Sequence, residues 1–182
     1  TVFGLGYQLP DTFTAATPLA QVAAGTYQAA CPCEAIVGLI PGAIGETSVI
    51  AIALGGLFLL WTGVASWRTM ISVFVGGAVA GLIFKALDMT PIEWYEHLVL
   101  GGFCFGAVFM ATDPVTSCRT NTGKYIFGVF VGLVAVTVRV MNPGYPEGMM
   151  LAILLMNMWA PLIDYCVVNS NISKRAKRAT IK

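Results

Sequence analysis

Five long apolar runs, separated by short polar turns, dominate this chain of 182 residues. They cover residues 47–64, 69–87, 95–112, 125–141 and 149–168. Each run is about long enough to cross a bilayer as a helix. Because 57% of the residues are hydrophobic and only 10% are charged, too few charges remain to solvate a globular surface. We therefore expect an all-α, polytopic membrane bundle of about five transmembrane helices over residues 47–173.

Residues 1–46 precede the first run and are rich in Gly, Ala and Pro. They contain two shorter apolar pieces, at about 18–25 and 35–44, and neither can span a membrane unaided. We expect short or re-entrant helices there. Irregular backbone is tolerated at membrane depth only where protein or a cavity surrounds it, which would suit a cofactor.

The basic residues predict how the chain lies in the membrane. If all five runs cross, Arg68, Arg119, Lys124 and the five basic residues of the tail at 174–182 share one side. Lys85 and Arg139 fall on the other side, near helix ends from which they can reach the interface. The basic side should be cytoplasmic. The pattern gives no basic face for nucleic acid.

A polar stretch before the first run, Asp11 to Leu19, carries the most specific signal. Thr17 followed by Pro18 is typical of the start of a helix, with Thr as the N-cap and Pro in the first turn. Helix N-termini also attract phosphate, so a phosphate linked to Thr17 would be favoured there. From the residues alone, both interpretations stay open.

The order Asp11, Thr14, Ala15, Ala16, Thr17 resembles the D-x-x-[ST]-[GA]-A-T signature at which a flavin transferase joins FMN to threonine through a phosphoester. The resemblance implies that Thr17 is the acceptor and that the other four residues form its recognition motif. Ala15 stands where glycine is common, which keeps the position small.

Four further stretches, at 41–48, 111–116, 142–154 and 160–164, resemble the B subunit of the sodium-translocating NADH:quinone oxidoreductases. The D subunit of the related Rnf complexes shares the threonine motif, Ile-Gly-Glu-Thr-Ser and Thr-Asp-Pro. The form Asn-Pro-Gly-Tyr-Pro-Glu-Gly-Met-Met at 142–150 favours the B subunit. The chain resembles only the second of the two similar five-helix halves of that protein.

This resemblance implies a redox subunit of a translocase in a bacterial inner membrane, with Thr17 towards the periplasm and the C-terminus in the cytoplasm. Covalent FMN would receive electrons from a neighbouring FMN-bearing subunit. A second flavin, non-covalent riboflavin, would pass them to ubiquinone, coupled to Na⁺ translocation. Other subunits, membrane lipid and the flavin transferase are the implied partners. No side chain need act as an acid–base catalyst.

Transport of Na⁺ requires carboxylates in or near the membrane. Because burying an ionised side chain in the bilayer is costly, such residues are candidates for function. Asp164 lies within the last run and has no visible capping role, and Asp113 ends the third run. Glu46 and Glu147 lie at helix starts, where they could simply compensate a helix dipole. Asp113 before Pro114 also reads as a turn. We expect these four residues on an ion pathway.

The remaining features are less specific. The five cysteines are interpreted as small apolar residues that pack in the interior. The spacing of Cys31 and Cys33 is too short for common zinc sites, so no metal site is expected. His97 reads as an anchor near the interface. A rival interpretation is a cofactor-free transporter half-repeat that uses Asp164 and the short helices of 18–44 as a substrate site. Flavin fluorescence would separate the two.

Overall fold

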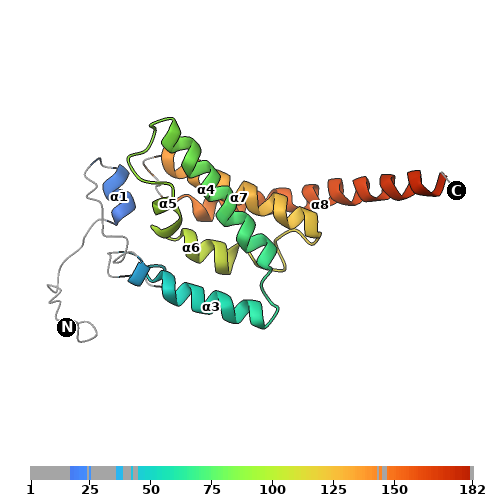
Figure 1. Cartoon of the computed structure of the whole chain (residues 1–182), viewed down its shortest axis with the longest axis horizontal. Helices are drawn as coiled ribbons and strands as arrows, with labels where there is room; N and C mark the ends of the chain where they lie inside the picture. The colour runs from blue at the N-terminus through green and yellow to red at the C-terminus, as the bar shows by residue number, and fades with distance from the viewer. Residues whose placement is uncertain are drawn as a thin grey trace.

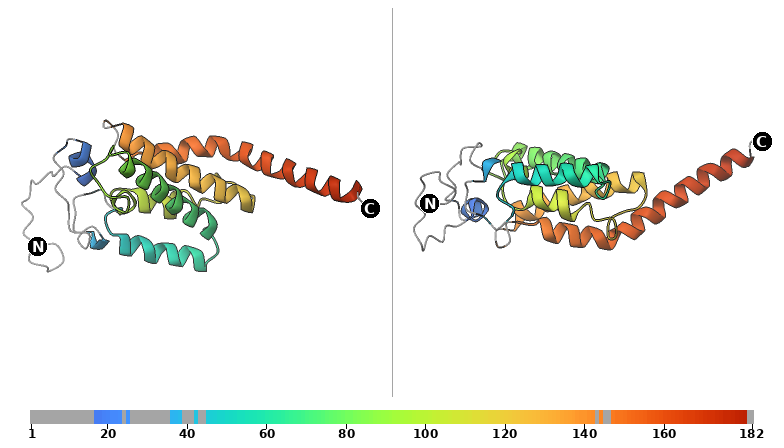
Figure 2. Two further views of the ribbon diagram at one scale, coloured as in Figure 1. Left: turned by 45° about the horizontal axis from the view of Figure 1, so that its top comes forward. Right: turned by 90° about the horizontal axis from the view of Figure 1, so that it is seen from below.

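The computed structural model describes residues 17–23, 25, 36–38, 42, 45–142, 144 and 147–180. The helices are α1 (Pro18–Ala23), α3 (Val49–Trp61), α4 (Trp67–Ala86), α5 (Glu96–Val99), α6 (Phe103–Phe105), the π-helix η1 (Gly106–Met110), α7 (Asn121–Met141) and α8 (Met149–Thr180). Across these ranges no residue lies in a strand. The helices α3, α4, α7 and α8 run roughly along one axis (Figures 1 and 2). The prediction of an all-α membrane bundle is confirmed.

Among the residues that the structure describes, three helices are long and apolar enough to cross a membrane, namely α4, α7 and α8. The first expected span is shorter, because α3 has only 13 residues. Ser48 begins it by accepting a hydrogen bond from the Ala51 N–H at 3.4 Å. Beyond its end, Gly63 has a φ of +73°, a left-handed conformation that stops helices.

The third expected span is not one helix but three pieces, α5, α6 and η1. The break falls at Gly101, whose φ is +68°. A Cβ atom there would collide with the Leu19 side chain of α1, so only glycine fits. In η1 the Ala111 N–H donates to the Gly106 carbonyl at 2.7 Å, a π-type bond across five residues. Apolar periodicity alone does not reveal either feature.

Glycines let α4 and α7 pack closely. A Cβ atom on Gly132 would lie 2.5 Å from the backbone nitrogen of Gly77, and one on Gly76 would overlap the Val129 carbonyl. The two helices are parallel, because both start at the same end, where Arg68 Nη1 donates to Asn121 Oδ1 at 2.7 Å. Small residues at such contacts are typical of membrane helices.

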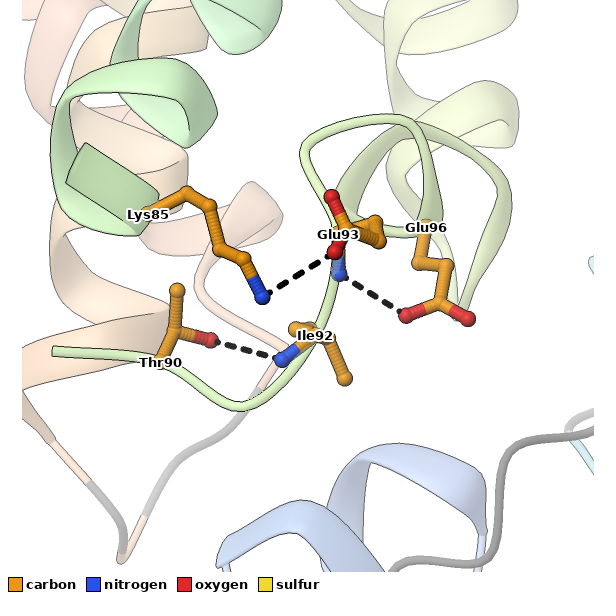
Figure 3. A network of polar contacts seen from close by, with 5 residues as sticks. All are labelled: Lys85, Thr90, Ile92, Glu93 and Glu96. Atoms are coloured by element: carbon orange, nitrogen blue, oxygen red, sulfur yellow. Dashed lines mark hydrogen bonds and ion pairs between the residues drawn. The ribbon is translucent and has the colours of Figure 1, made fainter. Parts of the chain in front are cut away.

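The loop between α4 and α5 is fixed by polar contacts (Figure 3). Lys85 Nζ and Glu93 Oε1 form an ion pair of 3.0 Å, and the Glu93 N–H donates to Glu96 Oε2 at 2.9 Å. The Ile92 N–H donates to Thr90 Oγ1 at 3.4 Å. Because the ion pair is partly exposed, it stabilises the fold by at most about 1 kcal/mol. It joins the last turn of α4 to the residues that precede α5.

The last helix, α8, has 32 residues and contains Pro161. At 1.5 Å per residue it is about 48 Å long. It therefore extends well beyond the other helices and carries the C-terminal end away from the bundle (Figure 1). The basic tail continues this helix as far as Thr180.

The core lies where α4, α7 and α8 meet α6 and η1. Val73, Phe103, Phe127, Val131 and Val136 are completely buried there. The outer faces, in contrast, expose large apolar side chains, such as Trp61 (84% exposed) and Met158 (78%). Such a surface suits lipid rather than water.

Candidate functional site

The structure divides the predicted site residues between two ends of the bundle. Thr17, Glu46 and Glu147 line one cavity. Asp164 contacts Thr120, the residue directly before α7. This start of α7 lies about 30 Å from the other end of the helix, because α7 has 21 residues. Asp113 lies in the loop that leads to that end.

The first four residues of the flavin motif, Asp11, Thr14, Ala15 and Ala16, lie outside the described residues. The motif is therefore represented only by its last residue.

Thr17 is the N-cap of α1, as its sequence context predicted. Its Oγ1 accepts a hydrogen bond from the Ala20 N–H at 3.3 Å, and its carbonyl accepts one from the Gln21 N–H at 3.0 Å. Leu19, only 2% exposed, packs against Leu100 and so attaches this short helix to the bundle. The Thr17 side chain is consequently held at a fixed place, half-buried at the end of the bundle.

The cavity beside Thr17 brings together segments that are far apart in the sequence. Its lining includes Thr17, Leu19, Glu46, Val99, Gly101 and Glu147. Two carboxyl groups thus face one partly buried space. Burial raises the pKa of Glu147, the charge of Glu46 raises it further, and Arg139 acts in the opposite direction.

Arg139 is buried at this end of the bundle, although the sequence predicted that it would reach the membrane interface. It is only 7% exposed, whereas its position near a helix end suggested a side chain reaching the interface. Its Nη1 donates to the His97 carbonyl at 2.6 Å and its Nη2 to the Glu147 carbonyl at 3.4 Å. One buried cation thereby joins α5, α7 and the turn before α8. Hydropathy cannot show this, because the acceptors are backbone carbonyls.

His97 is also placed differently from the expected interface anchor. It is 1% exposed, and neither ring nitrogen has a hydrogen-bond partner among the residues that the structure describes. Its imidazole is packed inside the bundle rather than at its edge.

At the other end, Asp164 of α8 binds the two residues that directly precede α7. Its Oδ2 accepts from the Arg119 N–H at 2.7 Å, and its Oδ1 accepts from the Thr120 N–H at 3.1 Å and from Thr120 Oγ1 at 2.6 Å. Thr120 is the N-cap of α7, and its Oγ1 in turn accepts from the Gly123 N–H at 3.1 Å. Asp164 therefore holds the capping residue, which is 44 residues away in the sequence, so no local pattern could reveal this role.

Asp113 forms a turn with the residues that follow it. Its Oδ1 accepts from the Val115 N–H at 3.2 Å and its Oδ2 from Thr116 Oγ1 at 2.8 Å. These hydrogen bonds lower the pKa of Asp113. The geometry agrees with the turn that Asp113-Pro114 suggested.

Within the described ranges, no three His, Cys, Asp or Glu side chains gather in a way that could hold a metal ion. Cys104, Cys118 and Cys166 are free thiols, and the first two are buried. Cys31 and Cys33 fall outside the described residues.

Comparison with known proteins gives consistent matches. The family model for the NQR2, RnfD, RnfE family matches residues 2–173. Proteins named as the B subunit of a Na(+)-translocating NADH-quinone reductase are similar over 92% of the chain, with 48% identity in Chromohalobacter salexigens and 47% in Pseudoalteromonas atlantica. A protein of the same name from Klebsiella pneumoniae is 46% identical, again over 92% of the chain.

The chain spans 43% of the first of these relatives and 44% of the other two, so it corresponds to less than half of each. The family match, in contrast, extends over nearly all of this chain. The chain is a multi-pass membrane protein and belongs to the NQR2, RnfD, RnfE family.

Proposed function

We propose that this chain is part of the B subunit of a Na⁺-translocating NADH:quinone oxidoreductase and that Thr17 carries FMN through a phosphoester. The observation that carries the proposal is the flavin motif ending at Thr17, in a chain 46–48% identical to proteins with that name. The position of Thr17 adds support, since Leu19 attaches its helix to the bundle.

The Thr17 side chain fits the role of an attachment point. Its hydroxyl oxygen takes part in one long hydrogen bond of 3.3 Å, to the Ala20 N–H, and that N–H can still donate to an ester oxygen. The six residues of α1 are too few for a helix-dipole argument, so the support for a phosphate here comes from the motif.

The neighbouring cavity is less suited to the phosphate. Glu46 and Glu147 both line it, and carboxylates repel a phosphodiester. We therefore expect the flavin to extend away from this cavity. When attached, the flavin supplies the electron transfer, while the chain fixes its position and surroundings.

The electron path follows from the resemblance to the B subunit. A neighbouring subunit with its own FMN would donate electrons, and non-covalent riboflavin would pass them to ubiquinone. The proposal includes the other subunits of the complex as partners and a flavin transferase for maturation. It places the chain in a bacterial inner membrane.

The ion pathway is proposed to use carboxylates at both ends of the bundle. Glu46 and Glu147 would serve the end near Thr17, and Asp113 and Asp164 the other end. The ion is proposed to be Na⁺, as in the names of the relatives. Asp164 already accepts three hydrogen bonds, so an ion there would have to share these oxygens with the start of α7.

One structural observation favours a cofactor-free transporter as the second candidate. The third apolar run is interrupted between α5 and α6, and interrupted helices often lie at transporter binding sites. An Rnf-type D subunit is a further alternative within the family. The names of the relatives favour the B subunit over it.

Denaturing gel electrophoresis with fluorescence detection tests the covalent flavin. The full-length protein would be produced in cells that contain the flavin transferase, alongside Thr17→Ala and a matched control, Thr116→Ala. We expect a fluorescent band for the unmutated protein and for the control, and none for Thr17→Ala. Absence of fluorescence in all three would favour the transporter.

A further inference from the structure

Two neighbouring cavities lie away from Thr17, one between α3 and the rest of the bundle and the other beyond the C-terminal end of α3. The first is a groove of about 240 Å³ whose lining includes Ile52, Ala53, Leu57, Phe74, Cys104 and Val108. Figure 1 shows α3 along the outer side of the bundle, next to α6. Among the residues that the structure describes, no charged side chain lines this groove, so its walls suit a hydrocarbon chain.

The second cavity, of about 250 Å³, has apolar walls at Val64, Pro114 and Cys118 and two cationic residues in its lining. We call it the basic mouth, and its lining includes Ser66, Thr112, Ser117, Arg119 and Lys124. Two cationic residues therefore line the same space. They are suited to an anion, because guanidinium and ammonium groups form strong hydrogen bonds to phosphate oxygens.

The basic mouth lies at one end of the groove. Val108 lines the groove and Thr112 lines the mouth, and Thr112 Oγ1 donates to the Val108 carbonyl at 2.6 Å. On the other wall, Leu60 lines the groove and Val64 lines the mouth. The basic mouth thus continues into the apolar groove along the same two walls.

Neighbouring acidic groups leave the two cations available. Within the described part of the chain, neither Arg119 nor Lys124 forms a salt bridge. Asp164 attracts Arg119, but its oxygens bind backbone N–H groups and a hydroxyl. The oxygens of Asp113 are held by Val115 and Thr116. The third cation at this end, Arg68, is bound to Asn121.

We propose that an anionic phospholipid of the surrounding membrane binds between α3 and the bundle, with its phosphate at Arg119 and Lys124 and one acyl chain in the groove. A free phosphate would use the mouth only, and a neutral isoprenoid would use the groove only. The combination matches one molecule that is charged at one end and apolar at the other. The basic residues place this end on the cytoplasmic side, where anionic lipid is enriched.

Lipid in this crevice would also support α3. Ile52, Cys104 and Val108 form a small buried cluster, separate from the main core, between α3 and the bundle. The remaining groove is open beside it, so an acyl chain would add apolar contacts that the protein itself lacks. The proposal does not depend on the flavin.

The test uses the full-length protein in lipid nanodiscs that contain a phosphatidylglycerol with a photoreactive acyl chain. After irradiation, mass spectrometry maps the labelled peptides. We expect label on 49–61 and 103–110, and at least several-fold less label from a phosphatidylcholine with the same chain. Equal labelling by the two lipids, or no label in these segments, would overturn the proposal. This comparison needs no variant, so a folding defect cannot obscure it.

Variants locate the two parts of the site. Arg119→Gln with Lys124→Gln should reduce labelling by anionic lipid about tenfold or more, since each cation near a surface contributes to lipid attraction. Lys174→Gln with Arg175→Gln is the charge-matched control in the tail and should leave labelling of the groove unchanged. Equal losses in the two double variants would indicate general attraction to the membrane and overturn the site.

The groove itself is tested on α3. Ala53→Trp fills the groove and should abolish the label, whereas Leu54→Trp is the control, because Leu54 is 65% exposed and does not line it. Unchanged labelling in Ala53→Trp would contradict a chain in the groove. Millimolar inorganic phosphate should not displace the lipid, and displacement would mean that the mouth alone provides the binding.

Discussion

Single carboxylates in this chain combine structural contacts with the ion role proposed for them. Asp164 illustrates this, because its two oxygens accept three hydrogen bonds from the residues that precede α7. A sequence pattern shows an acid within an apolar run and nothing of these partners. Replacing Asp164 is therefore expected to change both the stability of the fold and the proposed ion transport, and an experiment must separate the two effects.

Asp164→Asn should lower the free energy of unfolding by about 1–3 kcal/mol, since an amide offers one acceptor oxygen in place of two. Thermal unfolding in detergent micelles measures the change. Thr120→Ala removes the hydroxyl partner of Asp164 and keeps its charge, so it should destabilise the protein while Na⁺ dependence of quinone reduction persists. If Asp164→Asn unfolds like the unmutated protein, a stabilising role for its hydrogen bonds to Arg119 and Thr120 is contradicted.

The acids at the two ends should respond to pH in opposite directions. Burial raises the pKa of Glu147, so between its ordinary and its raised pKa the folded state holds a proton that the unfolded state has lost. Stability from this group therefore falls as pH rises through that window. The pKa of Asp113 is lowered, so its contribution is lost as pH falls.

Melting temperatures recorded from about pH 2 to pH 7 check these signs, because the Glu147 window lies above the ordinary carboxyl pKa and the Asp113 window lies below it. Glu147→Gln should remove a decline of stability with rising pH, and Asp113→Asn should remove an increase. The same slope in both variants and the unmutated protein would show that neither group is coupled to folding.

At the scale of helices, the sequence predicts continuous apolar elements well and interrupted ones poorly. The spans at 69–87, 125–141 and 149–168 correspond to α4, α7 and α8. The third run is broken at Gly101, whose φ is +68°, and the Leu19 side chain, 82 positions earlier in the sequence, lies where a Cβ atom of residue 101 would be. Gly76 and Gly77 lie in the contact between α4 and α7, so paired glycines within an apolar run are one sequence signal of close helix packing.

Gly132→Ala tests that contact. Its added Cβ would lie 2.5 Å from the Gly77 nitrogen, and because that neighbour is backbone, the helices must separate. We expect a loss of about 1–3 kcal/mol in the free energy of unfolding. Leu133→Ala, at the adjacent and more exposed position, is the control and should cost less. Equal effects would mean that close approach of the helices is not what glycine provides.

For the whole molecule, the two ends of the bundle differ in chemistry. Arg68, Arg119 and Lys124 lie at the end where α4 and α7 begin, and Thr17, Glu46 and Glu147 lie at the other. The sequence indicated the candidate acids but not which of them lie close together in the fold. Residues 46 and 147 meet only through the fold, and Arg139 and His97 were expected at the interface because burial depends on the surrounding helices.

The distribution of charge predicts that these ends face different compartments. A single cysteine introduced for labelling at Val115, 76% exposed, should react only with reagents that reach the cytoplasm. One at Gly25, which is exposed beyond α1, should react with an impermeant reagent added to intact cells. Both would be made in protein whose native cysteines are replaced by serine or alanine. Reaction of both sites from the same side would contradict the predicted topology.

The central claim is the covalent flavin at Thr17, and intact-mass analysis tests it most directly. The full-length protein would be purified from cells with the flavin transferase, beside the Thr17→Ala variant. The account predicts an added mass of roughly 0.44 kDa for the attached phosphoflavin. Fragmentation should place it on Thr17, and the variant should lack it. An unmodified mass in both proteins, or the same addition in the variant, would contradict the account.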